Sequence, residues 1–224
     1  MTESSERERD EHHQHDDAGK SHGSGAWDDE TAEWYVEHYG DHATNRMAVE
    51  RAQLQPDDVV VDVGCGSGEA VREAAARLQG GRVTGVDPTP AMIRIARDLS
   101  ASHAGRDRIQ FLEGSAEDLP LPDASATVVM AINSLHHWQE PVAGLAETMR
   151  VLVPGGQLLI ADEEPEKGCW GHGSGPMTDP AEVVRTVERA GFARVQISRH
   201  SEGEVTMNLL LARRPARDQP PKHR

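Results

Sequence analysis

A run of β-branched residues that ends in three alternating glycines constrains this chain more than any other feature. The run covers residues 59–63, and glycines follow at positions 64, 66 and 68. Four valines in five residues predict a strand buried on both faces, and helical spacing returns over residues 69–78. In a strand–glycine–helix unit, backbone N–H groups face a ligand. We therefore expect a ligand there, although a tight turn without a ligand would also use glycine.

The residue two positions before the first glycine narrows the choice of ligand. Dinucleotide-binding loops follow the spacing G-x-G-x-x-G. Here the spacing is G-x-G-x-G, and Asp62 precedes Gly64 by two positions. A carboxylate at the mouth of the loop repels a pyrophosphate and suits a cation. The spacing therefore argues against a nicotinamide-dependent oxidoreductase.

Strands and helices are predicted to alternate along the rest of the chain, which indicates an α/β fold. Two short helices are expected within residues 28–54. Further helices are expected to begin near Ala91, Pro141 and Ala181, and residues 153–156 read as a turn. The remaining strands are expected at residues 82–87, 108–114, 126–132, 157–161, 193–198 and 206–212.

Composition excludes several classes of partner. The formal net charge of −15 gives no general attraction to nucleic acid or to an anionic membrane. The longest apolar runs have strand length and the first residues lack a signal peptide's apolar core, so no membrane span or secretion signal is expected. Two cysteines, Cys65 and Cys169, make no disulfide framework, and we expect a cytoplasmic location.

A single domain is expected over residues 26–213, with a tail at each end. Residues 1–25 are rich in Glu, Asp and His without apolar periodicity, which predicts a disordered tail. Its histidines would hold a divalent metal only weakly, and no metal site is expected. Residues 214–224 read as a basic mobile tail. The domain itself divides into lid helices at 28–54, a core at 58–161 and a loop, helix and strand pair at 162–213.

Five short motifs follow one another in the core. They are DVGCGSG at 62–68, GVD at 85–87, AEDLP at 116–120, LHH at 135–137 and RVLVPGG at 150–156. Together they resemble the cofactor-binding core of class I S-adenosylmethionine-dependent methyltransferases, of the small-molecule type found in ubiquinone and menaquinone biosynthesis. The resemblance implies a Rossmann-like, doubly wound, seven-stranded sheet, mostly parallel with one antiparallel strand near the edge.

The implied activity is in-line transfer of a methyl group from S-adenosyl-L-methionine to a small-molecule acceptor. A non-catalytic cofactor-binding protein of the same fold stays open as an alternative. No insertion is large enough for a separate substrate domain, and the fourth strand ends in Asn133-Ser134-Leu135 rather than in the Pro-Pro motif of enzymes that methylate nucleic-acid bases. We expect no nucleic-acid partner, and a monomer or homodimer.

The resemblance also assigns roles to residues. Asp87, at the carboxyl end of the second strand, is expected to bind ribose hydroxyls. Ser115 and Ala116 would lie beside the adenine, and Asn133 near the transferred methyl. Ser115 replaces the family's usual Asp, so its contact with the adenine amino group carries no charge. The expected cofactor-binding residues are Asp62, Gly64, Cys65, Gly66, Gly68, Asp87, Pro88, Met92, Ser115, Ala116, Glu117, Asn133 and Leu135.

Two histidines and several aromatic residues are candidates for catalysis and for a lid. His136 and His137 follow the fourth strand, where a general base should stand; the alternative is a packing role. The lid is expected from the N-terminal helices and the loop at 163–180. The alternative for these segments is ordinary packing and a plain connector. The expected lid residues are Trp34, Tyr35, Tyr39 and Trp170.

Overall fold

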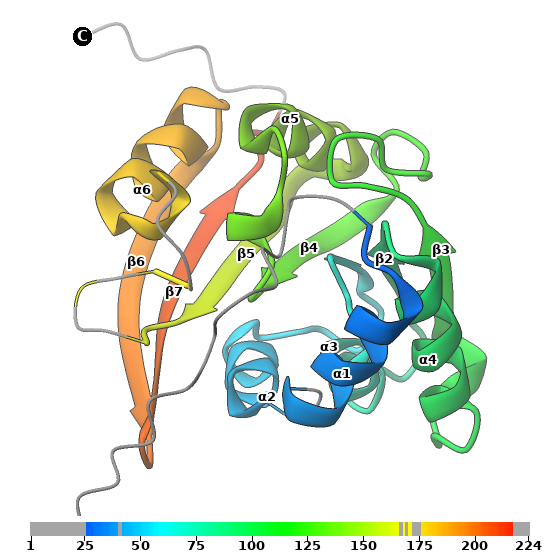
Figure 1. Cartoon of the computed structure of the whole chain (residues 1–224). Helices are drawn as coiled ribbons and strands as arrows, with labels where there is room; N and C mark the ends of the chain where they lie inside the picture. Colours follow the sequence, from blue (N-terminus) through cyan, green and yellow to red (C-terminus); the bar gives the residue numbers. More distant parts are fainter. Residues whose placement is uncertain (1–25, 40–41, 166–167, 169, 172–175, 217–224) are drawn as a thin grey trace, which may run out of the picture.

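Seven strands form one mixed sheet in the computed structural model, which describes residues 26–39, 42–165, 168, 170–171 and 176–216 (Figure 1). Their order across the sheet is β3-β2-β1-β4-β5-β7-β6. Neighbouring strands are parallel except that β7 is antiparallel to β5 and β6. The predicted fold class is thus confirmed. The strands are β1 (Val59–Val63), β2 (Arg82–Asp87), β3 (Ile109–Glu113), β4 (Ala126–Ile132), β5 (Leu152–Glu163), β6 (Ala193–Glu202) and β7 (Val205–Arg213).

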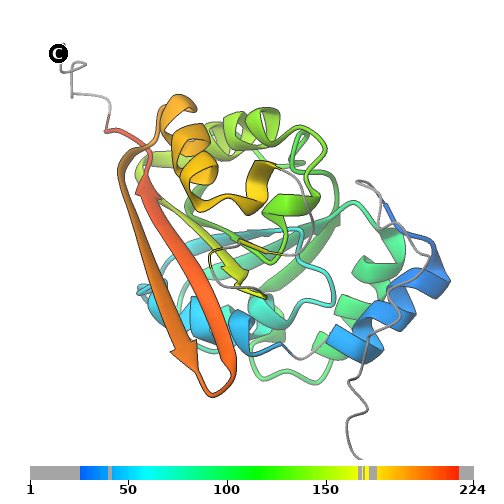
Figure 2. The same ribbon diagram turned by 60° about the vertical axis from the view of Figure 1, so that its left-hand side comes forward.

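Helices cover both faces of this sheet (Figures 1 and 2). One buried cluster joins the sheet to α2, α3 and α4, and a second joins it to α5 and α6. Because successive strand residues point to opposite faces, Val60 belongs to the first cluster and Val61 to the second. The helices are α1 (Asp29–Tyr39), α2 (Ala43–Arg51), α3 (Glu69–Ala75), α4 (Pro90–Ser100), α5 (Pro141–Val151) and α6 (Pro180–Arg189), with 3-10 turns η1 (Arg106–Arg108), η2 (Leu135–His137) and η3 (Pro176–Thr178).

The first helix has a core of its own. Ala32 of α1 is buried against Ala91 and Met92 of α4, with Tyr35 and Val36 packed around them. Both ribbon views show α1 beside α4 at the margin of the molecule (Figures 1 and 2). The helix is therefore attached to the main fold through a small contact.

Local signals explain where several helices begin. Pro90, Pro141 and Pro180 each occupy the first turn of their helix, where the missing N–H has no intrahelical partner to lose. Asp179 also caps α6 by accepting a hydrogen bond from the Ala181 N–H. Helix α6 then buries Val183 and Val187, one turn apart, against the sheet.

The fifth strand begins earlier than the sequence predicts. Leu152 already pairs with Ala126, and the register then shifts before Gln157 pairs with Val128. Gly155, with φ +83°, donates to the carbonyl of Arg214. The expected turn at 153–156 is thus a bulge within β5. It is held from outside by a residue far along the chain.

Arg214 itself differs from the expected mobile tail. Its N–H donates to the carbonyl of Gly156, and its guanidinium donates to the carbonyls of Met149, Arg150 and Leu152. A cation at these carbonyls stabilises the C-terminal end of α5. The ordered chain therefore continues past residue 213.

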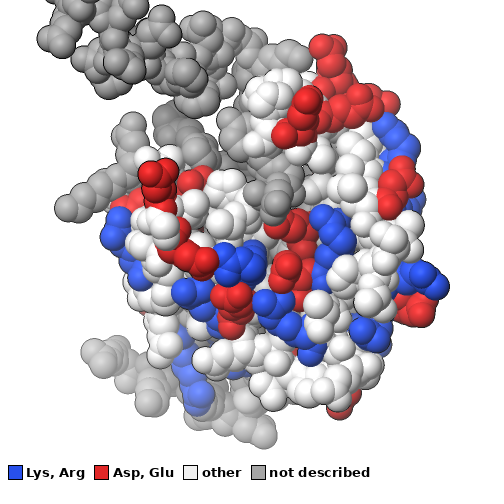
Figure 3. All heavy atoms as spheres, turned by 90° about the horizontal axis from the view of Figure 1, so that it is seen from below, with Lys and Arg blue, Asp and Glu red and all other residues white. Residues whose placement is uncertain are grey.

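Charged side chains of both signs are interspersed over the lower face of the molecule (Figure 3). Ion pairs join Arg46 of α2 to Glu202 of the β6–β7 hairpin at 2.5 Å and Arg77 to Glu73 at 2.8 Å. In the part of the chain that is described, no helix is both long and apolar enough to cross a membrane.

Candidate active site

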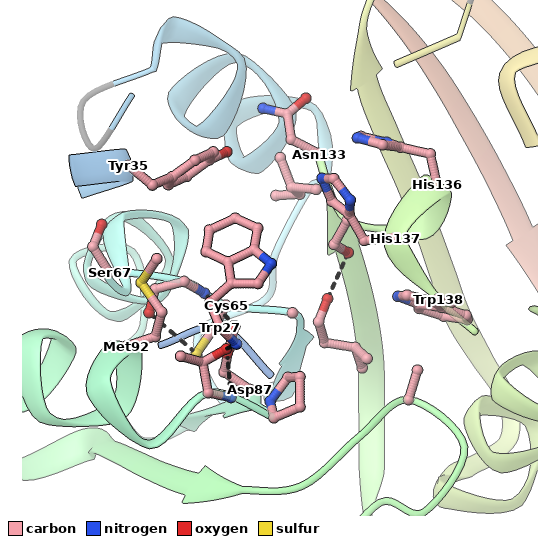
Figure 4. Close-up of a pocket in the computed structure, with 18 of the residues that line it drawn as sticks. Trp27, Tyr35, Cys65, Ser67, Asp87, Met92, Asn133, His136, His137 and Trp138 are labelled. Atoms are coloured by element: carbon pink, nitrogen blue, oxygen red, sulfur yellow. Dashed lines mark hydrogen bonds between the residues drawn. The ribbon is translucent and has the colours of Figure 1, made fainter. Parts of the chain in front are cut away.

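A cavity of about 340 Å³ lies at the carboxyl ends of β1, β2 and β4 (Figure 4). The chain leaves β1 for β2 on one side and later reaches β4 on the other side. Ligands of doubly wound sheets bind at such a switch point. Its walls come from the β1–α3 loop, the ends of β2 and β4, the loop after β3, and helices α1 and α2.

The glycine loop forms the floor of this cavity. Gly64 donates to the carbonyl of Val86 at 2.8 Å, and Gly66 donates to Oδ2 of Asp87 at 2.9 Å. A Cβ added to Gly66 would meet no atom within 4 Å, so the space above it is open. Gly68 serves packing instead, because a Cβ there would lie 2.7 Å from Cζ of Phe111. The loop thus presents bare backbone to a ligand.

Asp87 is held rigidly at the edge of the cavity. Its Oδ1 accepts from the Thr89 N–H and its Oδ2 from the Gly66 N–H, both at 2.9 Å. Burial raises the pKa of Asp87, and these two N–H groups oppose that shift. A carboxylate has about four lone-pair sites in all, so Asp87 can still accept a hydrogen bond from a ligand hydroxyl.

Asp62 lies behind the loop and does not line the cavity. It is 2% exposed, and its Oδ1 has no hydrogen-bond partner among the described residues. Burial raises the pKa of Asp62 to about 7, and the nearby Asp87 carboxylate adds to the shift. A positive ligand above the loop would favour its charged form.

The structure brings most of the predicted cofactor residues together. Asp62, Gly68 and Leu135 lie behind the wall, and Leu135 is fully buried in the core. The predicted residues that line the cavity are Gly64, Cys65, Gly66, Asp87, Pro88, Met92, Ser115, Ala116, Glu117 and Asn133.

The two predicted histidines both line the cavity, but in different settings. His136 is paired through Nδ1 with Oδ1 of Asp162 at 3.0 Å, and the side chain of Asp162 is fully buried. The other oxygen of Asp162 accepts from Nε1 of Trp170 at 2.6 Å. His137 instead packs edge-on to the Trp27 ring, with centroids 6.1 Å apart.

The Asp162 contact defines what His136 can do. A carboxylate at Nδ1 fixes the tautomer that carries its proton there and leaves Nε2 as the nitrogen that accepts a proton. Trp170 in turn fixes the carboxylate. An imidazole held in this way can act as a proton acceptor.

The predicted lid residues fall in three places. Trp34 and Tyr35 line the cavity from α1, whereas the side chain of Tyr39 lies outside the described residues. Trp170 is fully buried and does not line the cavity, so it supports Asp162 rather than covering a ligand. Most of residues 166–175 also lies outside the described part, so the lid expectation for that loop stays a prediction.

Glu69 is a polar residue of the cavity lining that sequence reasoning did not single out. Glu69 accepts from the His42 N–H at 3.0 Å and from Nδ2 of Asn45 at 2.6 Å. Nε2 of His42 lies 3.1 Å from Oε2 of Glu163, whose N–H donates to Oδ1 of Asn133. Residues 41–46 are unusually polar for a core helix, which predicts that they face the substrate, and His42 and Asn45 line the cavity.

Trp27 was also missed, although it lies at the centre of the site (Figure 4). Its N–H donates to Oγ1 of Thr89 at 3.0 Å, and its ring packs on Tyr35 with centroids 4.8 Å apart. It precedes the first predicted helix and so had no periodic signal. The segment before α1 is thus part of the wall.

The carboxylates of the described cavity lining are not balanced by any Lys or Arg. Carboxylates of Glu69, Asp87, Glu117 and Glu163 line the cavity, and the described lining contains no Lys or Arg. Such a site favours a ligand whose net charge is positive or zero and disfavours one whose net charge is negative.

Comparison with known proteins agrees with this geometry. Residues 61–160 match a family model described as a methyltransferase domain. The chain is 37% identical over 139 residues to 27-O-demethylrifamycin SV methyltransferase of Amycolatopsis mediterranei, covering 62% of this chain and 49% of that one. It is 33% identical over 132 residues to demethylmenaquinone methyltransferase of Deinococcus radiodurans, covering 58% and 54%. It thus spans about half the length of these curated relatives.

A solved structure extends the comparison to the whole fold. The crystal structure of a SAM-dependent methyltransferase from Aquifex aeolicus superposes with a TM-score of 0.64 and 22% identity, over 84% of this chain and 98% of that one. The family match, the glycine motif and the strand order agree. Residues 61–160 are thus similar to a methyltransferase domain, and the chain shares the fold of a solved SAM-dependent methyltransferase.

Proposed function

We propose that the protein transfers a methyl group from S-adenosyl-L-methionine to a hydroxyl group of a small, neutral or cationic molecule, with His136 as general base. The observation that carries this proposal is the buried pairing of His136 with Asp162 at the cavity wall. The relative from Amycolatopsis is named for methylation at an oxygen, which supports the choice of a hydroxyl acceptor.

The described residues fit the cofactor. Asp87 stands where ribose hydroxyls would donate, and the open space above Gly66 accepts a ligand close to the backbone. Carboxylates without a lining Lys or Arg, among the residues described, suit the sulfonium and the amino group. When bound, S-adenosyl-L-methionine supplies an electrophilic methyl group. Ser115 and Ala116 would lie beside the adenine, and Asp62 would favour the positive ligand from behind the loop.

The protein's own part in the reaction is to orient the acceptor and to take its proton. Nε2 of His136 accepts the hydroxyl proton, while Asp162 keeps the ring in place and stabilises the resulting imidazolium. Trp27, Trp34 and Tyr35 cover the site and exclude water. Holding the acceptor in line provides most of the acceleration, since effective molarities reach roughly 10⁵–10⁸ M.

The electrostatics of the cavity support the proposed class of acceptor. A phosphorylated or carboxylated acceptor would enter beside Glu69 and Glu163 with no described Lys or Arg of the lining to neutralise it. The mixed charges of the lower face also favour no nucleic-acid partner. Cytoplasmic location and a monomeric or homodimeric state remain predictions.

A non-catalytic cofactor-binding protein is the second reading. It would need neither an oriented base nor a buried carboxylate beside it, and burying Asp162 without use costs stability. An oxidoreductase is opposed by the glycine spacing and by the family match.

The test is a methyl-transfer screen of phenols, sugars and macrocyclic alcohols, followed by the variants His136→Asn and Asp162→Asn. We expect kcat to fall by about 10²–10⁴-fold for His136→Asn, the usual contribution of a general base, while calorimetry shows unchanged S-adenosylhomocysteine affinity. His200→Asn, on β6 and outside the cavity lining, is the matched control and should keep full activity. Full activity of His136→Asn would remove the base from this proposal.

A further inference from the structure

One buried donor at the cavity wall has no hydrogen-bond partner among the residues that the structure describes. Trp138 follows η2 and is 9% exposed. Its Nε1 makes no hydrogen bond within the described part of the chain. The residue lines the cavity, and Figure 4 shows the indole nitrogen on the side of the ring that faces it. The donor is therefore both buried and aimed at the ligand space.

An unpaired buried donor requires an explanation. Leaving one unsatisfied costs about 1–3 kcal/mol, and native structures contain few of them. The contrast with Trp170 is direct, because its Nε1 donates to Asp162 at 2.6 Å. The partner of Trp138 is best supplied from the cavity.

The indole ring cannot turn to find another partner. A Cβ added to Gly144 of α5 would lie 2.4 Å from Cε3 of Trp138 and 3.2 Å from Cβ of Ala116. The six-membered part of the ring therefore packs against the one glycine of α5, close to Ala116. Close packing fixes the direction of its N–H bond.

The position of Trp138 indicates which part of a ligand it meets. Ala116 belongs to the loop after β3, and Ser115, Ala116 and Glu117 line the same wall. On the proposed function, this loop lies beside the adenine. A purine ring presents unprotonated ring nitrogens at its edge, and an indole N–H can only donate. Ser115 contributes no carboxylate to this wall, so the binding of the adenine depends more on the other polar contacts there.

We propose that Trp138 determines purine specificity by donating its Nε1–H to a ring nitrogen of the bound adenine. This inference rests on the proposed function, because it takes S-adenosyl-L-methionine as the cofactor. This hydrogen bond would offset the cost of burying the unpaired N–H group, in a part of the cavity wall that is shielded from water. Ligand binding thus completes the polar pairing of this side of the cavity.

The test is a protein–ligand double-mutant cycle read by titration calorimetry, without turnover. The probes are S-adenosylhomocysteine and its 1-deaza, 3-deaza and 7-deaza analogues, each of which lacks one ring nitrogen. Trp138→Phe keeps an aromatic ring and removes the donor. We expect this variant to bind S-adenosylhomocysteine about tenfold more weakly. One deaza analogue should bind the unaltered protein equally weakly and be insensitive to Trp138→Phe.

A second variant displaces the donor without removing it. Gly144→Ala keeps the indole but displaces it from its packed position. It should therefore weaken the binding of S-adenosylhomocysteine by a similar factor. A melting temperature for each variant checks that the fold persists. An equal loss for all four probes on Trp138→Phe, or no loss for any, would overturn the inference while leaving the proposed function intact. Failure of the unaltered chain to bind S-adenosylhomocysteine would instead overturn the proposed function and this inference with it.

Discussion

Two buried carboxylates at the ends of neighbouring strands differ in how they are satisfied. Asp87 accepts backbone N–H groups on both oxygens, whereas Oδ1 of Asp62 accepts none from the described residues. Both carry a raised pKa because burial disfavours the charged form. Folding therefore disfavours the ionised form of Asp62.

This opposition predicts a pH-dependent stability for the protein without ligand. The pKa of Asp62 is about 7 in the folded state, against about 3.9 in an unfolded chain. Between these values the folded state binds more protons, so the free energy of unfolding falls as pH rises. The full shift corresponds to on the order of 4 kcal/mol. Asp62→Asn removes the titrating group.

Urea unfolding of the unaltered protein and of Asp62→Asn at pH 5 and pH 8 measures the effect. The variant should gain stability relative to the unaltered protein at the higher pH, by a difference on the order of a few kcal/mol. Parallel changes in the two proteins would show that Asp62 does not titrate in this window.

Helix α1 forms part of the cavity wall and is attached to the rest of the fold by a small contact. Its buried contact with α4 consists of Ala32, Ala91 and Met92, separate from the two main clusters. The Trp27 N–H on Thr89 and the exposed Asp29–Arg94 pair at 3.2 Å add to it. Since exposed ion pairs contribute at most about 1 kcal/mol, the apolar contact decides whether the helix stays docked.

Ala32→Glu should therefore undock α1 without unfolding the sheet, because a carboxylate cannot stay buried against Met92. We expect turnover to fall at least about tenfold, while the melting temperature changes little and S-adenosylhomocysteine still binds. Glu33→Gln, at the neighbouring exposed position, is the matched control and should behave as the unaltered protein. An Ala32→Glu variant with full turnover would show that α1 is not needed to cover the acceptor.

The sequence predicted those elements whose signals are local. The valine run gave β1, and the strand-end acid gave Asp87 its correct place at the cavity. The bulge at Gly155 was read as a turn, because its partner is Arg214. Trp170 was predicted to be a lid residue, because the sequence does not show that its indole N–H donates to Asp162 at the end of β5. Asp162 itself could have been found, since parallel strands β4 and β5 end side by side and His136 follows β4.

For the whole molecule, the distribution of charge determines how the cavity acts on a charged ligand. The chain has a formal net charge of −15, and the described lining of its cavity includes four carboxylates and no Lys or Arg. Over distances beyond the Debye length, about 10 Å at 0.1 M salt, such a field is screened. Within the cavity it acts at short range on whatever charge the ligand carries.

The cofactor and its demethylated product differ in charge by one unit at the sulfur, which makes this field measurable. S-adenosyl-L-methionine carries a sulfonium, whereas S-adenosylhomocysteine carries a neutral thioether, so the acidic cavity should favour the former electrostatically. Raising salt from about 0.02 M to about 0.5 M shortens the Debye length several-fold. It should weaken binding of S-adenosyl-L-methionine severalfold and change binding of S-adenosylhomocysteine less.

Calorimetry on the full chain and on a chain lacking residues 1–24 makes the comparison. The truncated chain should retain its affinity for S-adenosylhomocysteine, because the composition of those residues predicts a disordered tail. Equal salt dependence of the two ligands would mean that the lining carboxylates do not act on the sulfonium.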